Sequence, residues 1–165
     1  MAVLAFCTYG ISALLTPDEG RYAEIAREML VHGQYIVPHI NSIVYFEKPP
    51  LIYWLTSLSF SWFGWSEWAA RFWGAAFYLI TLFYTYFVIR KIYTRRLARY
   101  SVFVLASSML FLMISHMLTL DFGVTFFINT CLLTFWFCIH CYLERKTVRI
   151  LLLIVAYVLM GCAVM

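Results

Sequence analysis

The sequence is short of charge. Only 12% of its 165 residues are Asp, Glu, Lys or Arg, whereas 64% are apolar and 20% are aromatic. A soluble globular domain carries about twice that share of charged residues. The composition therefore excludes an ordinary water-soluble monomer. Because the apolar residues also fall in long runs, they predict an all-α protein with several membrane-spanning helices.

A disulfide framework and a second domain are also missing. The five cysteines lie in apolar runs and their number is odd, which argues against paired disulfides. Cys138 and Cys141 have the spacing of a metal or redox pair, but no second pair lies nearby, so we interpret the cysteines as core residues. No repeat, low-complexity tract or Gly/Ser linker indicates a further domain.

The net charge of +4 would fit a nucleic-acid-binding protein only if the basic residues shared one solvated face. They do not. Eight of the twelve lie in two short segments between apolar runs: Arg90, Lys91, Arg95, Arg96 and Arg99, then Arg145, Lys146 and Arg149. This is the positive-inside pattern of cytoplasmic loops. Seven of the eight acids lie elsewhere, so residues 16–67 and the turn around Asp121 are predicted to face outward.

Apolar runs predict the spans at residues 69–89, 100–118, 122–143 and 150–165. A first run, residues 2–15, would rise only about 21 Å as a helix, short of a hydrocarbon core of about 30 Å. No basic segment precedes it and no small-residue cleavage site follows, so a signal peptide is disfavoured. The last run, residues 150–165, ends without a flanking polar residue, so we expect the sequence to be truncated at both ends.

The long outer segment is predicted to hold two helices that lie in the membrane interface. Thr16 and Pro17 have the residue types of a helix start, Glu19 is placed as the capping-box partner, and Gly33 is a typical stop. A second helix, over residues 51–64, follows a pair of prolines and is too short to span a bilayer.

Candidate functional residues lie in this segment. Asp18, Arg21 and Tyr22 are spaced to share a helix face, although the acid could simply complement the helix dipole. Glu47 and Lys48 precede the rigid prolines, which favours a ligand site, although Lys48 could instead reach lipid phosphates.

Asp121 lies between two apolar runs, and an ionisable residue so close to a membrane is a functional candidate. The alternative is an acid that only starts the next helix. Two other groups of charges have plain structural interpretations. Glu67 and Arg71 are spaced as an ion pair that anchors a span, and Arg27 and Glu28 are expected to be solvated.

Four motifs carry a resemblance to a known family. They are Pro17-Asp18-Glu19, the segment from Arg21 to Leu30, Tyr45-Phe46-Glu47-Lys48-Pro49-Pro50-Leu51 with Tyr53-Trp54-Leu55, and Leu118-Thr119-Leu120-Asp121. Together they resemble the N-terminal part of polyprenyl-phosphate-dependent glycosyltransferases. The lipid A 4-amino-4-deoxy-L-arabinose transferase group is the most similar, with the protein O-mannosyltransferases more distant. The resemblance implies a C-type glycosyltransferase fold in the bacterial inner membrane, with an active site open to the periplasm. Residues 1–165 would be the first part of its transmembrane domain, without the C-terminal spans and the periplasmic domain.

The resemblance also implies roles for particular residues. Asp18 and Asp121 match the catalytic acids. Residues that match the substrate-binding site are Arg21, Tyr22, Glu47 and Lys48. Glu47 matches a ligand of a divalent metal ion, any histidine partner of which would lie beyond Met165.

The implied partners are a polyprenyl-phosphate sugar donor, lipid A or another periplasmic acceptor, and membrane lipids, but no nucleic acid. A protein or glycan hydroxyl is the alternative acceptor. A transporter fragment is the alternative of another class, and it is disfavoured because the acids lie at the outer ends of the spans and not at mid-span.

Overall fold

The structure is a computed structural model that describes residues 14, 17–140 and 146–164. Its elements, in chain order, are α2 (Asp18–His32), β1 (His39–Ile40), β2 (Ile43–Val44), α3 (Leu51–Phe63), α4 (Glu67–Ile92), α5 (Arg95–Ser107), α6 (Met109–Ser115), α7 (Leu120–His140) and α8 (Lys146–Val164). The prediction of an all-α membrane protein is therefore confirmed, with one short hairpin added.

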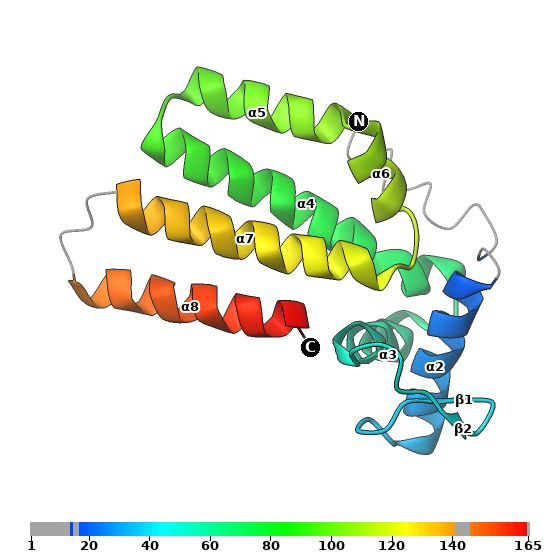
Figure 1. The fold of residues 1–165 in the computed structure, drawn as a ribbon. Coiled ribbons are helices and arrows are strands. Elements are labelled where there is room, and N and C mark those ends of the chain that lie inside the picture. The colour runs from blue at the N-terminus through cyan, green and yellow to red at the C-terminus, as the bar shows by residue number, and fades with distance from the viewer. Residues whose placement is uncertain (1–13, 15–16, 141–145, 165) are drawn as a thin grey trace.

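The long helices form a membrane bundle. Helices α4 and α7, and residues Thr147–Val164 of α8, are long and apolar enough to cross a bilayer, and α5 and α6 make a fourth, bent segment. In Figure 1 the helices α5, α4, α7 and α8 lie side by side in this order, and contacts join each of them to the next. The protein is a multi-pass membrane protein.

The span predicted over residues 100–118 is not one straight helix. Helix α5 begins earlier, at Arg95, because Thr94 caps it by accepting a hydrogen bond from the backbone N–H of Leu97 (3.3 Å). It ends at Ser107. The next residue, Ser108, has an extended backbone (φ −64°, ψ 111°), and α6 departs at an angle of 63°. The hydroxyl of Ser107 donates a hydrogen bond to the carbonyl oxygen of Val104 (3.1 Å), and serines that bond back to their own helix in this way often bend it.

The bundle has two chemically different ends. The turn between α4 and α5, the end of α7 and the start of α8 lie together on the left of Figure 1. We call this the arginine-rich end, since it carries Arg90, Arg95 and Arg149. Helices α2 and α3, the hairpin and the start of α7 lie at the opposite end, which we call the α2 end. The predicted separation of basic and acidic segments is confirmed.

Helix α2 ends where the sequence predicts. Gly33 adopts the left-handed conformation (φ 67°) that closes a helix and that glycine accepts at no steric cost. Its start differs slightly. Pro17 is the N-cap and its carbonyl accepts from the N–H of Arg21 (3.2 Å), so the helix begins at Asp18. Thr16, the predicted cap, lies outside the described residues.

The structure corrects the expectations for three charged residues, Glu19, Arg71 and Glu28. Glu19 does not lie at the surface, because it is buried and pairs with Arg71 of α4, the residue we had paired with Glu67; its predicted capping-box partner, Thr16, lies outside the described residues. Glu28 is not solvated. It is buried and accepts hydrogen bonds from the backbone N–H groups of Asn41 (2.6 Å) and Ser42 (3.4 Å). Both acids face neighbouring backbone rather than water.

Those N–H groups belong to the tip of a hairpin in a stretch that the sequence had left irregular. Strands β1 and β2 are antiparallel, and both tip residues, Asn41 (φ 51°) and Ser42 (φ 66°), have positive φ. Two such residues make the tight turn that matches strand twist. The chain then reaches α3, which starts after Pro50 as predicted and packs on α2 and α4.

The core joins α3 to the spans. Phe77 of α4 stacks on Phe126 of α7 with ring centroids 4.4 Å apart, and buried Ile52 of α3 belongs to the same cluster. Gly123 of α7 lets Ile52 approach closely, because a Cβ at that position would collide with its side chain. The first turn of α7 is thereby held against α3.

Candidate functional site

The start of α2 presents three of the predicted site residues. Asp18 is the first residue of the helix, and its carboxylate lies 3.7 Å from the guanidinium of Arg21 one turn later. The Asp18 side chain is 65% exposed and that of Arg21 is 34% exposed, so both can be reached from outside. An exposed pair of this kind contributes little to stability, and it leaves an acid and a cation available to a ligand.

The segment after β2 brings Glu47 to the same place. Buried Tyr45 donates its hydroxyl hydrogen to Glu47 Oε2 (2.9 Å). Tyr45 raises the pKa of Arg21 more than the charges of Asp18 and Glu47 do, so the Tyr45 hydroxyl also lies close to the guanidinium of Arg21. Tyr45 therefore links the start of α2 to the Glu47 segment.

Asp121, in the first turn of α7, faces the same region. Burial is the main cause that raises the pKa of Tyr22, and the negative charges of Asp18 and Asp121 raise it further. Tyr22 thus lies within electrostatic reach of both acids. Asp121 and Lys48 line one cavity of about 140 Å³ between the start of α3, the first turns of α7 and the end of α8. The predicted site residues are brought together at the α2 end.

Comparison with known proteins places this arrangement in a family. The sequence profile of the dolichyl-phosphate-mannose-protein mannosyltransferases matches residues 47–165. The chain belongs to this family. Its three-dimensional fold is similar to the crystal structure of ArnT from Cupriavidus metallidurans bound to undecaprenyl phosphate, with a TM-score of 0.94 and 28% identity. That match covers 98% of this chain and 30% of the other.

The chain is also similar to curated proteins that are named as arabinosyl transferases. The chain is 37% identical over 124 residues to the undecaprenyl phosphate-α-4-amino-4-deoxy-L-arabinose arabinosyl transferase of Wigglesworthia glossinidia brevipalpis, covering 74% of this chain and 22% of the relative. The transferase of the same name from Aeromonas salmonicida is 35% identical over 151 residues, 91% of this chain and 26% of the relative. The chain spans about a quarter of the length of these relatives.

The part of this mannosyltransferase-family chain that the structure describes does not hold a complete metal site. Among its described residues, no three His, Cys, Asp or Glu side chains come close enough together to bind a metal ion. The Glu47 carboxylate accepts its hydrogen bond from Tyr45, and it would be one ligand at most. No step proposed below passes through a metal.

Sequence reasoning gave no role to two tyrosines that complete the site. Tyr45 is the link described above. Tyr53 of α3 is fully buried, and its ring centroid lies 5.9 Å from that of Tyr22. Its hydroxyl has no hydrogen-bond partner within the described residues, and burial raises its pKa. Both tyrosines occur in the motifs, close to Glu47, and this proximity was the available signal.

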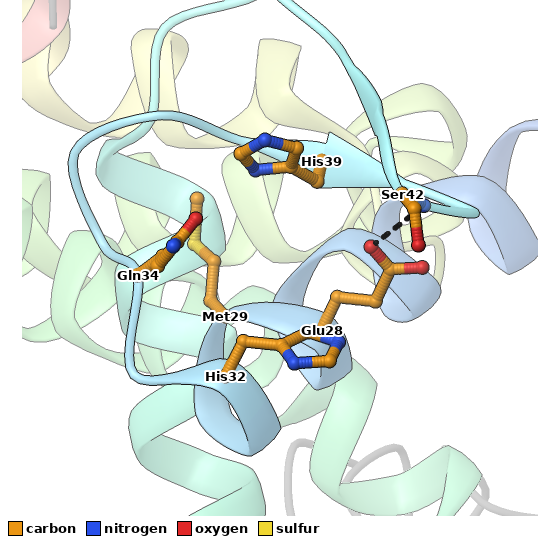
Figure 2. A pocket seen from close by; sticks show the side chains of 6 residues that line it. All are labelled: Glu28, Met29, His32, Gln34, His39 and Ser42. Atoms are coloured by element: carbon orange, nitrogen blue, oxygen red, sulfur yellow. Dashed lines mark hydrogen bonds between the residues drawn. The ribbon is translucent and has the colours of Figure 1, made fainter.

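A second hollow, of about 330 Å³, lies at the other end of α2 (Figure 2). Its lining residues are Glu28, Met29, His32, Gln34, His39 and Ser42. The Glu28 carboxylate points to the backbone of Ser42, and His39 Nδ1 lies 2.8 Å from the carbonyl oxygen of Val37. None of the predicted site residues lines it, so we regard it as separate from the candidate site.

Proposed function

We propose that the protein is a membrane glycosyltransferase that moves 4-amino-4-deoxy-L-arabinose from a polyprenyl-phosphate donor to a lipid A phosphate. Residues 1–165 would form the N-terminal part of its transmembrane domain in the bacterial inner membrane, followed by further spans and a periplasmic domain. The α2 end would face the periplasm. The observation that carries this proposal is the gathering of Asp18, Arg21 and Lys48 with Asp121 at the α2 end, in the fold of a protein crystallised with undecaprenyl phosphate.

The donor chemistry explains why cations and acids occur together. Transfer breaks the bond between the anomeric carbon and the phosphate oxygen, and the polyprenyl phosphate leaves with the bonding electron pair. Arg21 and Lys48 are placed to stabilise the charge of the leaving phosphate. The sugar carbon gains positive charge in the transition state, which a carboxylate such as Asp18 or Asp121 offsets, as carboxylates do in glycoside hydrolysis.

The acceptor decides whether a base is needed. A phosphate monoester has a second pKa of about 6 and is already largely an oxyanion at neutral pH. Such an acceptor attacks the anomeric carbon without first losing a proton. A protein or glycan hydroxyl would instead need a general base, and the exposed carboxylate of Asp18 is the side chain best placed for it.

The decisive experiment expresses the full-length gene in bacteria that lack their own aminoarabinose transferase, and examines lipid A by mass spectrometry. We expect the mass of one or more aminoarabinose units on lipid A from the wild type, and none from the Asp18→Asn and Lys48→Ala variants. Glu24→Gln is a matched control on the same helix, since Glu24 lies outside the site and pairs with Arg27. Modification that persists in both site variants would reject the proposed roles.

The same cells separate the two acceptors. If lipid A stays unmodified but purified protein releases free polyprenyl phosphate from the donor, the reaction class stands and the acceptor is a hydroxyl. If the donor is not consumed at all, the proposal fails. Metal analysis of the full-length protein, with and without Glu47→Gln, tests whether Glu47 helps to hold a divalent ion.

A further inference from the structure

Glu19 lies next to Asp18 in the chain but points to the interior. Its side chain and that of Arg71 are each 2% exposed. Two contacts join the groups, from Arg71 Nη2 to Glu19 Oε2 (2.8 Å) and from Arg71 Nε to Glu19 Oε1 (3.0 Å). This fork geometry holds the start of α2 on α4 in a defined orientation.

The same carboxylate holds a third segment. Glu19 Oε1 accepts a hydrogen bond from the backbone N–H of Leu118 (2.6 Å), which lies in the link between α6 and α7. Leu118 begins the motif that ends at Asp121. One carboxylate therefore connects the first turn of α2, which carries Asp18, to the segment that delivers Asp121.

The surface of α4 leaves room for the segment that joins α6 to α7. Gly74 lies one turn after Arg71, and a Cβ at Gly74 would stand 2.6 Å from the carbonyl oxygen of Ser115 and 3.7 Å from that of Met117. Only a glycine allows the backbone to come so close. The link is thus seated against α4 by packing and held by Glu19 through a hydrogen bond.

We infer that Glu19 is a positioning residue which, held by Arg71, sets the distance between the two site acids Asp18 and Asp121. The inference rests on the proposed function, because it assigns Glu19 to the geometry of that site. Glu19 itself does not touch substrate. It acts by fixing two chain segments that are distant in sequence and that each carry one carboxylate.

Energetics distinguish this role from mere stabilisation. A buried ion pair adds little net stability compared with apolar residues of similar size, so the pair is a poor way to hold α2 on α4. An apolar residue could replace that packing, but it could not accept the N–H of Leu118. The property that only an acceptor at position 19 supplies is the connection to the Asp121 segment.

The first test measures this connection without any activity. Hydrogen exchange of full-length protein in detergent, read by mass spectrometry, reports the amides between α6 and α7. We expect the Leu118 amide to exchange about tenfold faster in Glu19→Ala, because it loses its acceptor. Glu19→Gln keeps an acceptor oxygen and should show a smaller change. Glu24→Ala, which removes an exposed pair from the same helix, should leave the segment unchanged.

The second test measures turnover on the same samples. A displaced carboxylate lowers kcat by about tenfold or more while KM for the donor stays within about twofold, because the binding cations remain in place. A merely structural role would lower the yield of folded protein and leave kcat per folded molecule unchanged. Gly74→Ala is the second variant: it pushes the same segment away from α4 without changing any charge, and it should reproduce the loss in kcat.

The outcomes separate the two proposals. Unchanged exchange at Leu118 in Glu19→Ala, or a kcat within about twofold of the wild type in folded Glu19→Ala protein, overturns the positioning role. A wild type that consumes no donor rejects the proposed function, and the exchange experiment still decides whether Glu19 holds the Asp121 segment.

Discussion

Two kinds of acid lie side by side at the α2 end, and their surroundings differ sharply. Asp18 has a side chain that is 65% exposed, whereas the next residue, Glu19, is 2% exposed. We call Glu19 and Glu28 the inward acids, because both are buried and accept hydrogen bonds from the backbone of another segment. We call the exposed carboxylates of Asp18, Glu47 and Asp121 the rim acids.

The difference shows which carboxylates hold chain segments together and which remain accessible to a ligand. Burying a carboxylate is costly unless hydrogen bonds and a countercharge compensate it, so an inward acid holds its partners in one geometry. A rim acid is exposed to solvent and needs no buried countercharge. Its side chain remains free to meet a ligand, and this is what a reaction on a lipid-linked sugar requires.

We expect the largest change in stability when an inward acid loses the cation that it pairs with. Arg71→Met leaves Glu19 buried without its countercharge, and we expect it to lower the free energy of unfolding by about 3–5 kcal/mol. Thermal and denaturant unfolding of full-length protein in detergent would measure it. The double variant Glu19→Leu with Arg71→Met should recover most of this stability yet stay impaired in turnover. A double variant with wild-type turnover would remove the distinction between the two kinds of acid.

Removing a rim acid should have the opposite profile. We expect Asp18→Asn to lower kcat by about a hundredfold or more, as loss of a catalytic carboxylate does, while the unfolding free energy changes by no more than about 0.5 kcal/mol. Turnover of a polyprenyl-phosphate sugar and the unfolding midpoint are measured on one preparation. If instead stability fell as far as in Arg71→Met, Asp18 would belong with the inward acids.

The second inward acid offers a test at the other end of α2. Glu28→Ala removes the acceptor for the N–H groups of Asn41 and Ser42, and we expect it to cost about 1–3 kcal/mol. Amide exchange at the hairpin tip should rise, because without Glu28 only the two short strands would hold the tip. Glu24→Ala is again the control. Unchanged exchange at the tip would show that Glu28 does not hold the hairpin.

The rim of the site was predictable because its geometry is local. Spacing along a single helix places Asp18, Arg21 and Tyr22 together, and the family motif adds Glu47, Lys48 and Asp121. The spans and the separation of the two ends follow from apolar runs and from the clustering of arginines. These signals need only neighbouring residues. The fold confirmed the separation of the two ends and the spans of α4, α7 and α8, but not a straight span over residues 100–118.

The inward acids were not predictable in the same way. Glu19 meets Arg71 across 52 positions and Leu118 across 99, and nothing in the helical spacing indicates such contacts. The local pattern even offered Arg71 a closer partner, Glu67, which the folded chain does not use. Long-range pairing depends on how helices pack, and packing is decided by the whole core.

The hairpin and the break between α5 and α6 were not predicted from the sequence, for other reasons. The strands β1 and β2 have two residues each, too few for alternation of polar and apolar residues to appear, so Asn41 and Ser42 were the available turn signal. The break in the α5–α6 segment depends on one extended residue, Ser108, inside a run that is otherwise apolar. Hydropathy averages over such a residue and reports one continuous span.

The smallest expected effect concerns an acid that belongs to neither group. Glu24 pairs with Arg27 (2.6 Å), with about a third of each side chain exposed. Hydrogen bonding with Arg27 lowers the pKa of Glu24 below its ordinary value of 4.5. The pair therefore stabilises the folded state above that pH, and its contribution is lost as the pH falls through the lower pKa of the folded state.

Because solvent screens the pair, we expect Glu24→Gln to cost no more than about 0.5 kcal/mol of unfolding free energy at pH 7. The difference from wild type should vanish in unfolding experiments carried out well below pH 4.5. A cost near that of Arg71→Met would mean that exposure does not separate the acids of α2, and the comparison between inward and rim acids would lose its physical basis.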